Sequence, residues 1–186
     1  MPADLPELLR RADQADPQAT EQLFAALYGE LHRLAEHHLE RGASLTLGTT
    51  TLVHDAYLSM VGRQDVKFPD RARFFAYASR AMRGLVIDYA RRRRAKKRGR
   101  EYEITLVEEE VPAGTALEAG QDLQELGDAL DDLAQLNPHL AELVDLHFFA
   151  GFSFSEIAEL RGVSERTVQR DWRKARLLLH HALKED

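Results

Sequence analysis

Apolar side chains recur at intervals of three and four residues along most of the chain, which places them on one face of an α-helix. The stretch from Phe75 to Tyr89 shows the pattern clearly, with Ala78, Met82 and Val86 between its ends. The strict alternation of apolar and polar residues that is typical of β-strands is nearly absent. The sequence therefore predicts an all-α protein.

The apolar stripes and their flanking residues set the expected helix boundaries. Asp16 and Asp70 are expected N-caps, because a short acceptor side chain satisfies the free N–H groups of a first turn. Gly62 is an expected C-cap. We expect helices over residues 5–15, 17–39, 50–61, 70–97, 123–136, 138–150 and 154–160, and a final helix that follows Ser164.

Charge is distributed very unevenly. Between Arg71 and Arg100 there are twelve Lys or Arg and one acid, a local charge of +11. The segment 101–160 contains fifteen acids and no Lys or Arg, although the whole chain carries only −6. Residues 99–121 combine Pro, Gly and Glu with weak periodicity, as linkers do. We expect a helical bundle over 1–97, an acidic linker over 98–121 and a second helical domain over 122–186.

Composition excludes several classes of protein. The 186 residues suit one ordinary domain or two small ones, and 44% hydrophobic content is enough for packed cores. The absence of cysteine excludes disulfides and thiolate metal sites. No signal peptide and no apolar run of about 20 residues is visible. We expect a soluble cytoplasmic protein that is not an enzyme and holds no metal or cofactor.

One face of the expected helix over 70–97 joins an aromatic side chain to basic ones. Arg73, Tyr77, Arg80, Gly84 and Arg91 lie opposite its apolar stripe. Burial usually claims large aromatics, so an outward tyrosine among arginines is unusual. The alternatives are an ordinary exposed aromatic in a solvated charge run and a surface on which nucleic-acid bases stack, and we favour the second.

The stretch 153–179 has the pattern of a helix-turn-helix. Ser153 and Glu156 form a capping box, and Gly162 can adopt the positive φ of a tight turn. Ala158 is small where the two helices must cross, and Val168 fills the space between them. The alternative is a helical hairpin with a basic solvent face, but these packing positions favour DNA binding.

Three stretches, in this order, resemble those of bacterial extracytoplasmic-function (ECF) sigma factors of the sigma-70 family. They are TTTLVHDAYLSM, FFAYASRAMRGLVIDYARRRR and GFSFSEIAELRGVSERTVQRDWRKARLLL. The resemblance implies a transcription initiation factor that binds core RNA polymerase and helps melt promoter DNA, with an anti-sigma factor as a further partner. It also implies a linker along the path later taken by RNA.

The resemblance assigns residues to three contacts. The −10 promoter element would meet Phe68, Arg73, Phe74, Tyr77, Arg80 and Arg91. The −35 element would meet Arg166, Thr167, Gln169, Arg170, Arg173 and Lys174. The polymerase β′ coiled coil would meet Thr50, Thr51, His54, Asp55 and Leu58.

Two departures from the family pattern matter. Gly84 stands where an asparagine is usual, and Thr50 and Thr51 stand where acidic residues are common. A phosphate there would supply about −1.5 to −2 charge. We therefore hypothesise that a Ser/Thr kinase modifies Thr51, with Thr50 as the second candidate; the alternative is that the threonines only cap the helix.

Two alternative functions fit the sequence less well. A conventional helix-turn-helix regulator that acts without polymerase explains the C-terminal domain but leaves the Tyr77 helix without a role. An enzyme would need a catalytic constellation. His32, His37 and His38 do not share a helix face and are expected at the surface, and His54 and Asp55 are expected to point apart.

The charge contrast also predicts the free state. The basic helix and the acidic linker are opposite in sign and close in sequence. We expect a compact, partly self-masked protein, with the linker or the C-terminal domain packed on the N-terminal domain. We expect this contact to loosen with salt, because exposed charges are screened beyond about 8 Å at physiological ionic strength.

Overall fold

The computed structural model describes residues 4–41, 46–61, 63, 67–101 and 113–184. Within these residues the structure is helical and contains no strand, which confirms the all-α prediction. The helices are α1 (Leu5–Asp13), α2 (Pro17–Ala26), α3 (Tyr28–Arg41), α4 (Thr49–Met60), α5 (Arg71–Glu101), α6 (Ala113–Leu136), α7 (Pro138–Val144), the π-helical turn η1 (Asp145–Phe149), α8 (Phe154–Arg161) and α9 (Glu165–Ala182).

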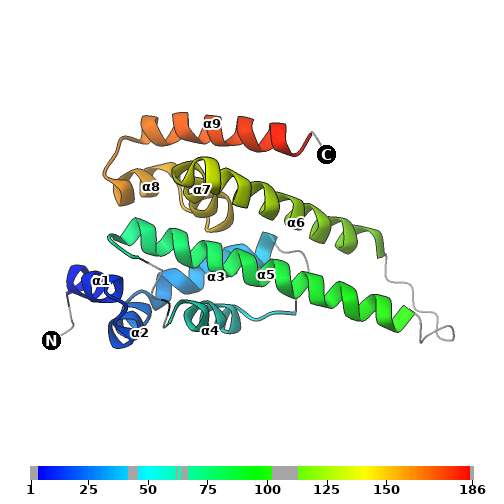
Figure 1. Cartoon of the computed structure of the whole chain (residues 1–186), viewed down its shortest axis with the longest axis horizontal. Helices are drawn as coiled ribbons and strands as arrows, with labels where there is room; N and C mark the ends of the chain where they lie inside the picture. Colours follow the sequence, from blue (N-terminus) through cyan, green and yellow to red (C-terminus); the bar gives the residue numbers. More distant parts are fainter. Residues whose placement is uncertain (1–3, 42–45, 62, 64–66, 102–112, 185–186) are drawn as a thin grey trace.

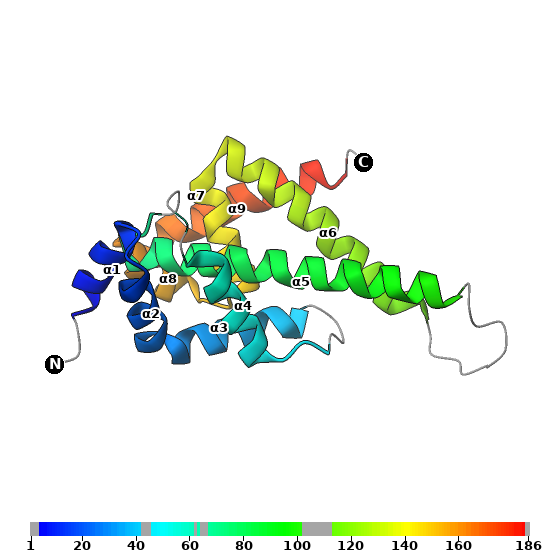
Figure 2. The ribbon, with the colours of Figure 1, turned by 60° about the horizontal axis from the view of Figure 1, so that its bottom comes forward.

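The long helix α5 runs through the middle of the molecule. In the view of Figure 1, α1, α2 and α4 lie on one side of it and α6 to α9 on the other, while α3 passes behind it. The second view shows α3 beside α4 (Figure 2). The second view shows that the C-terminal part of α5 extends beyond the body, with α6 crossing beside it (Figure 2). None of the described helices has both the length and the apolar character needed to cross a membrane.

Most of the expected caps are present. The Asp16 carboxylate accepts from the backbone of Gln18 and Ala19, and Asp70 accepts from the Arg73 N–H at 2.8 Å. Ser153 and Glu156 form the capping box, and Gly162 adopts φ 63°. The expected C-cap Gly62 lies outside the described residues.

The expected helix over 17–39 is wrong in one respect, because it is two helices. Leu27 leaves the helical region with φ −105° and ψ 14°, so α2 ends at Ala26 and α3 begins at Tyr28. The helix α6 also begins at Ala113, inside the segment that we expected to be linker. The described ends of these two elements therefore differ from the ones that periodicity predicted.

One hydrophobic core joins the two halves of the chain, which are the N-terminal half, α1 to α5, and the C-terminal half, α6 to α9. Phe74, Phe75 and Met82 of α5 belong to the same buried cluster as Leu146 and Ile157. A second cluster lies within the C-terminal half and includes Leu130, Leu133, Leu140, Val144, Phe149, Ala175 and Leu179. The C-terminal half therefore packs directly on α5, as the expected compact state requires.

Candidate nucleic-acid and polymerase interfaces

Tyr77 lies half-buried at the edge of the basic face of α5. Its ring packs edge-on against Phe68 with ring centroids 5.7 Å apart. The Arg63 guanidinium lies 3.5 Å from its hydroxyl. The side chains of Arg73, Arg80 and Arg91 are exposed on this helix. An aromatic ring held in place beside exposed cations is a physically suitable surface for a stacked base and its phosphates.

Two of the expected DNA-binding aromatics are not accessible. Phe68 is 2% exposed and Phe74 is 0% exposed. Their rings pack edge-on against each other at 5.5 Å, and Phe74 contacts Phe24 in the same way. The expectation that they contact bases is wrong for this conformation, because both rings belong to the core. Phe68 packs against the ring of Tyr77, and Phe74 packs against Phe68.

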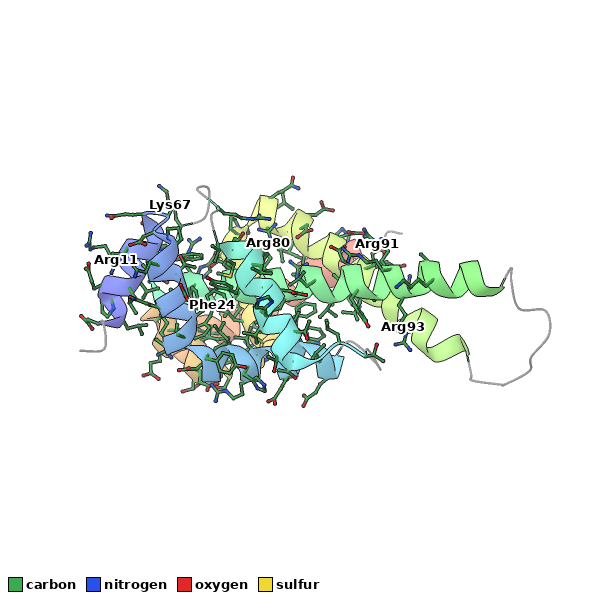
Figure 3. All side chains as sticks on the ribbon, turned by 90° about the horizontal axis from the view of Figure 1, so that it is seen from below. Arg11, Phe24, Lys67, Arg80, Arg91 and Arg93 are labelled. Atoms are coloured by element: carbon green, nitrogen blue, oxygen red, sulfur yellow. The ribbon has the colours of Figure 1, made fainter. Side chains whose placement is uncertain are left out.

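The C-terminal half places acids on the basic face of α5. Arg73 Nη1 donates to Glu142 Oε1 of α7 at 2.8 Å, and Arg80 Nη2 lies 3.6 Å from Asp131 Oδ1 of α6. Arg80 and Arg91 lie along the edge of α5 that is turned toward α6 (Figure 3). Two arginines expected at the −10 element therefore already have carboxylate partners.

A buried ion pair that the sequence did not reveal joins the two halves. Arg83 Nε donates to Asp145 Oδ1 at 2.9 Å, and Arg83 Nη1 donates to the Gly127 carbonyl at 3.2 Å. The exposed fractions of the two residues are 4% and 3%. Burial raises the pKa of Asp145 to about 6, against the opposing charge of Arg83. The one available signal was an acid inside the apolar run Leu143–Phe149.

A second buried polar contact adjoins the ion pair. His38 Nε2 and Ser79 Oγ are 2.9 Å apart, and the Ser79 hydroxyl donates to the Asp145 carbonyl at 2.9 Å. The His38 ring stacks on Phe149, and burial lowers the pKa of His38 to about 3. The expectation that His38 is a surface residue is therefore wrong. It is a neutral part of the contact between α3, α5 and η1.

The histidines His32, His37 and His54 each lie near a carboxylate of their own helix. His32 lies 3.4 Å from Glu36, and His37 lies 3.6 Å from Glu40. The His54 ring and the Asp55 carboxylate do not point apart, since their nearest atoms are 3.7 Å from each other at the surface of α4. Within the described residues, no group of three or more His, Asp or Glu could hold a metal ion.

The helix-turn-helix formed by α8 and α9 presents an open basic face. Ala158 and Val168 are buried where the two helices pack. Four of the six expected −35 residues are exposed, and the other two, Thr167 and Gln169, are half-buried. The Thr167 hydroxyl lies 2.9 Å from the Ser164 hydroxyl, and Gln169 donates to Glu165. The exposed residues are Arg166, Arg170, Arg173 and Lys174.

Arg161 fixes the orientation of this motif. Its Nη2 donates to the His139 carbonyl at 3.1 Å and lies 3.8 Å from Glu142, the acid that also binds Arg73. Burial lowers the pKa of its guanidinium below the usual value. The structure makes Arg161 the link between α8 and the α7 surface that faces α5.

The expected polymerase-binding residues lie together on α4. Thr50, Thr51, His54 and Leu58 are exposed and Asp55 is half-buried, while Leu52, Val53 and Ala56 face the core. The N-cap of this helix is Gly48, which has no side-chain oxygen. Thr50 and Thr51 therefore occupy the second and third helical positions, and the alternative that they cap the helix is wrong.

The fold and these surfaces define a helical protein with a helix-turn-helix and a basic helix, and the family comparison agrees. A family model described as ECF sigma factor matches residues 2–185. The chain therefore belongs to the ECF sigma factor family, whose members bind core RNA polymerase and direct transcription initiation at promoters. Comparisons with curated proteins and with solved structures gave no match.

Proposed function

We propose that this sigma factor recognises its promoter through two separate surfaces and docks on polymerase through a third. The face of α5 around Tyr77, with Arg73, Arg80 and Arg91, binds the opened −10 strand. The exposed face of α9 binds the −35 element as duplex DNA. The exposed face of α4 binds the β′ coiled coil. The protein acts in the cytoplasm, and an anti-sigma factor is a further partner.

The observation that carries this proposal is that α5 and α9 present different kinds of side chain. The recognition helix α9 projects Arg and Lys from a motif whose packing positions are filled by Ala158 and Val168. Arginine can read base edges in the major groove, and lysine holds phosphates. The helix α5 instead holds an aromatic ring among cations, which suits an unstacked base.

Run-off transcription from a genomic promoter library, with and without core polymerase, tests the function. We expect promoter-specific transcripts only when the chain and the core enzyme are both present. A conventional helix-turn-helix regulator would bind duplex DNA tightly by itself and would not program core polymerase. Tight, specific duplex binding without any polymerase-dependent transcript would decide for that alternative.

We also propose that phosphorylation of Thr51 by a Ser/Thr kinase strengthens polymerase binding. Thr51 is exposed in the first turn of α4, where the helix N-terminus favours negative charge. No acid occurs in that first turn. A phosphate would add about −1.5 to −2 charge where a basic partner surface requires it. Thr50, also exposed, is the second candidate.

Three substitutions test this switch. We expect Thr51→Ala to abolish activation by the kinase and Thr51→Glu to give partial polymerase affinity, since a carboxylate carries one charge. Thr49→Ala, in the same turn but half-buried, is the matched control. Core-polymerase affinity and transcription are the measurements. Equal polymerase affinity of the unphosphorylated wild type, Thr51→Ala and the phosphorylated protein would exclude the switch.

A further inference from the structure

A hollow opens in the C-terminal half where α9 runs along α6 and α7 (Figure 1). We call it the α9 hollow, the space bounded by Leu126 of α6, Val144 of α7, Phe148 of η1 and Leu179 of α9. Its volume is about 690 Å³. Sites for small molecules in proteins usually measure about 300–1,000 Å³, so the hollow has the size of a ligand site.

The walls of the α9 hollow are apolar. Val144 and Leu179 belong to the second buried cluster, and Leu126 and Phe148 pack half-buried against it. Leu177 and Leu183 also line the hollow and are 72% and 44% exposed. Apolar side chains that gather at a hollow, rather than scattering singly over a surface, mark a site of binding. The walls therefore suit an apolar ligand or the apolar part of a larger one.

The charged groups of the α9 hollow are all basic and come from one helix. Arg173, Arg176 and His180 follow one another on α9 at spacings of three and four residues, which places them on one side of the helix. Among the described residues that line the hollow, none is an acid. Guanidinium groups bind carboxylates through paired hydrogen bonds. A cationic edge beside apolar walls is complementary to an amphipathic anion.

We propose that the α9 hollow binds a free long-chain carboxylate, with the alkyl chain against Leu126, Val144 and Phe148 and the carboxylate at Arg173 and Arg176. Arg173 also belongs to the expected −35 surface. A carboxylate on this residue neutralises a cation that would otherwise hold DNA, so the bound acid weakens duplex binding by α9. This consequence rests on the proposed function, whereas the ligand site itself does not.

Three ligands that share one alkyl chain and differ in head-group charge test the site. They are decanoate, decanol and decyltrimethylammonium, each titrated into the full chain by calorimetry below the concentration at which it forms micelles. We expect decanoate to bind about fivefold more tightly than decanol, because only the anion pairs with the arginines. Decyltrimethylammonium should bind more weakly than decanol, because its charge has the same sign as the edge of the hollow.

Two neighbouring leucines provide a matched pair of variants. Leu177 lines the α9 hollow, whereas Leu178 is exposed outside it, so the same change to Glu adds an acid inside the hollow in one variant only. We expect Leu177→Glu to weaken decanoate binding about fivefold and to strengthen decyltrimethylammonium binding. Leu178→Glu should leave both affinities near those of wild type. A reversed charge preference cannot arise from unfolding.

Duplex binding tests the consequence for DNA. We expect saturating decanoate to weaken the binding of a labelled DNA duplex about fivefold at about 0.15 M salt, which is the effect of one lost phosphate contact. Decanol at the same concentration is the control, since it carries no charge. Unchanged duplex binding with decanoate bound would overturn the competition with DNA and leave the ligand site in place.

Other results would overturn the ligand site itself. Decanoate that binds no more tightly than decanol would do so, as would equal decanoate affinities of Leu177→Glu and Leu178→Glu. Binding to phosphatidylglycerol vesicles without binding to free decanoate would assign the cations to a membrane surface instead. A dimer in sedimentation velocity that Leu177→Glu disrupts would assign the hollow to a second copy of the chain. If wild type gives no polymerase-dependent transcript, the proposed function fails, while the calorimetry, which uses no DNA, still decides the ligand site.

Discussion

The two surfaces that we assign to promoter DNA differ in how the free protein presents them. On α9 the basic side chains point to solvent, and the acids near them belong to the same helix. On α5, Arg73 and Arg80 are paired with acids from the other half of the chain, while Arg91 lies 3.8 Å from Asp88 of its own helix. The basic face of α9 is therefore open to solvent in this structure, whereas the basic face of α5 is partly covered by α6 and α7. Arginines on a helix surface thus have two uses in this protein: on α9 they face solvent, and on α5 two of them hold the C-terminal half through ion pairs.

Removing one member of the buried ion pair should have the largest effect, because this pair holds the C-terminal half on α5. We expect Arg83→Met to lower the free energy of unfolding by about 3–5 kcal/mol, because it leaves Asp145 buried without its partner. Urea unfolding followed by circular dichroism measures the change. The double variant Arg83→Met with Asp145→Leu should regain much of the loss. Equal losses in the single and double variants would contradict a specific pair.

The pH dependence of stability separates the two buried groups. The pKa of Asp145 is raised from 3.8 to about 6, so this group favours the folded state as pH falls through that interval. The pKa of His38 is lowered from 6.5 to about 3, so this group costs stability as pH falls below 6.5. Between pH 4 and 6 the two effects have opposite signs and offset each other.

The substitution Asp145→Asn would reveal the contribution of His38 to the pH dependence of stability, because it removes the opposing contribution of Asp145. We expect the variant's free energy of unfolding to fall, relative to wild type, by about 1.4 kcal/mol for each pH unit between 6 and 4. The groups that face this pair are Arg80, Arg83 and Asp131 around Asp145, and His37 and Arg83 around His38. Urea titrations across this interval measure the difference. Parallel stability curves for the two proteins would refute the offset.

Substitutions on α9 test the exposed basic face of this helix. We expect Arg170→Ala and Arg173→Ala each to cost about 1–3 kcal/mol of promoter discrimination if they read bases, or to reduce the salt dependence if they hold phosphates. Neither should unfold the chain, since both side chains are exposed. Arg176→Ala, the same charge change on this helix, is the control. Normal promoter-specific transcription by the double variant would remove the assignment.

Salt should have the smallest effect. Screening weakens the exposed pairs of Arg73 and Arg80, each worth about 0.2–1 kcal/mol, but leaves the apolar core and the buried Arg83 pair. We therefore expect small-angle scattering to show the same compact shape at low and high salt, in contrast to the salt-loosened contact that the sequence predicts. Marked expansion at high salt would show that charge alone closes the molecule.

Local features of this fold were predictable because local chemistry determines them. The caps at Asp16 and Ser153 and the turn at Gly162 need only neighbouring backbone groups. The packing residues Ala158 and Val168 follow from their spacing. These features located the helix-turn-helix, and the family match over residues 2–185 agrees with the resemblance that they helped to carry.

Contacts between distant segments were not predictable in this way. An arginine in a basic helix is ordinarily solvated, and nothing near Arg83 in sequence shows that its partner is Asp145. Phe68 and Phe74 illustrate the same limit, because an aromatic beside arginines fits a core and a ligand surface equally well. Only the packed structure shows that they are 2% and 0% exposed.

The sequence separation of the closing pair also has a consequence during synthesis. Asp145 lies 62 residues after Arg83. At about 5–20 residues per second, roughly 3–12 s pass between translation of the two. During that interval the nascent chain carries its basic helix without the acids that later cover it. The basic helix is therefore uncovered when it leaves the ribosome and is covered only later. Contact of the uncovered helix with cellular RNA is the hazard that this order creates.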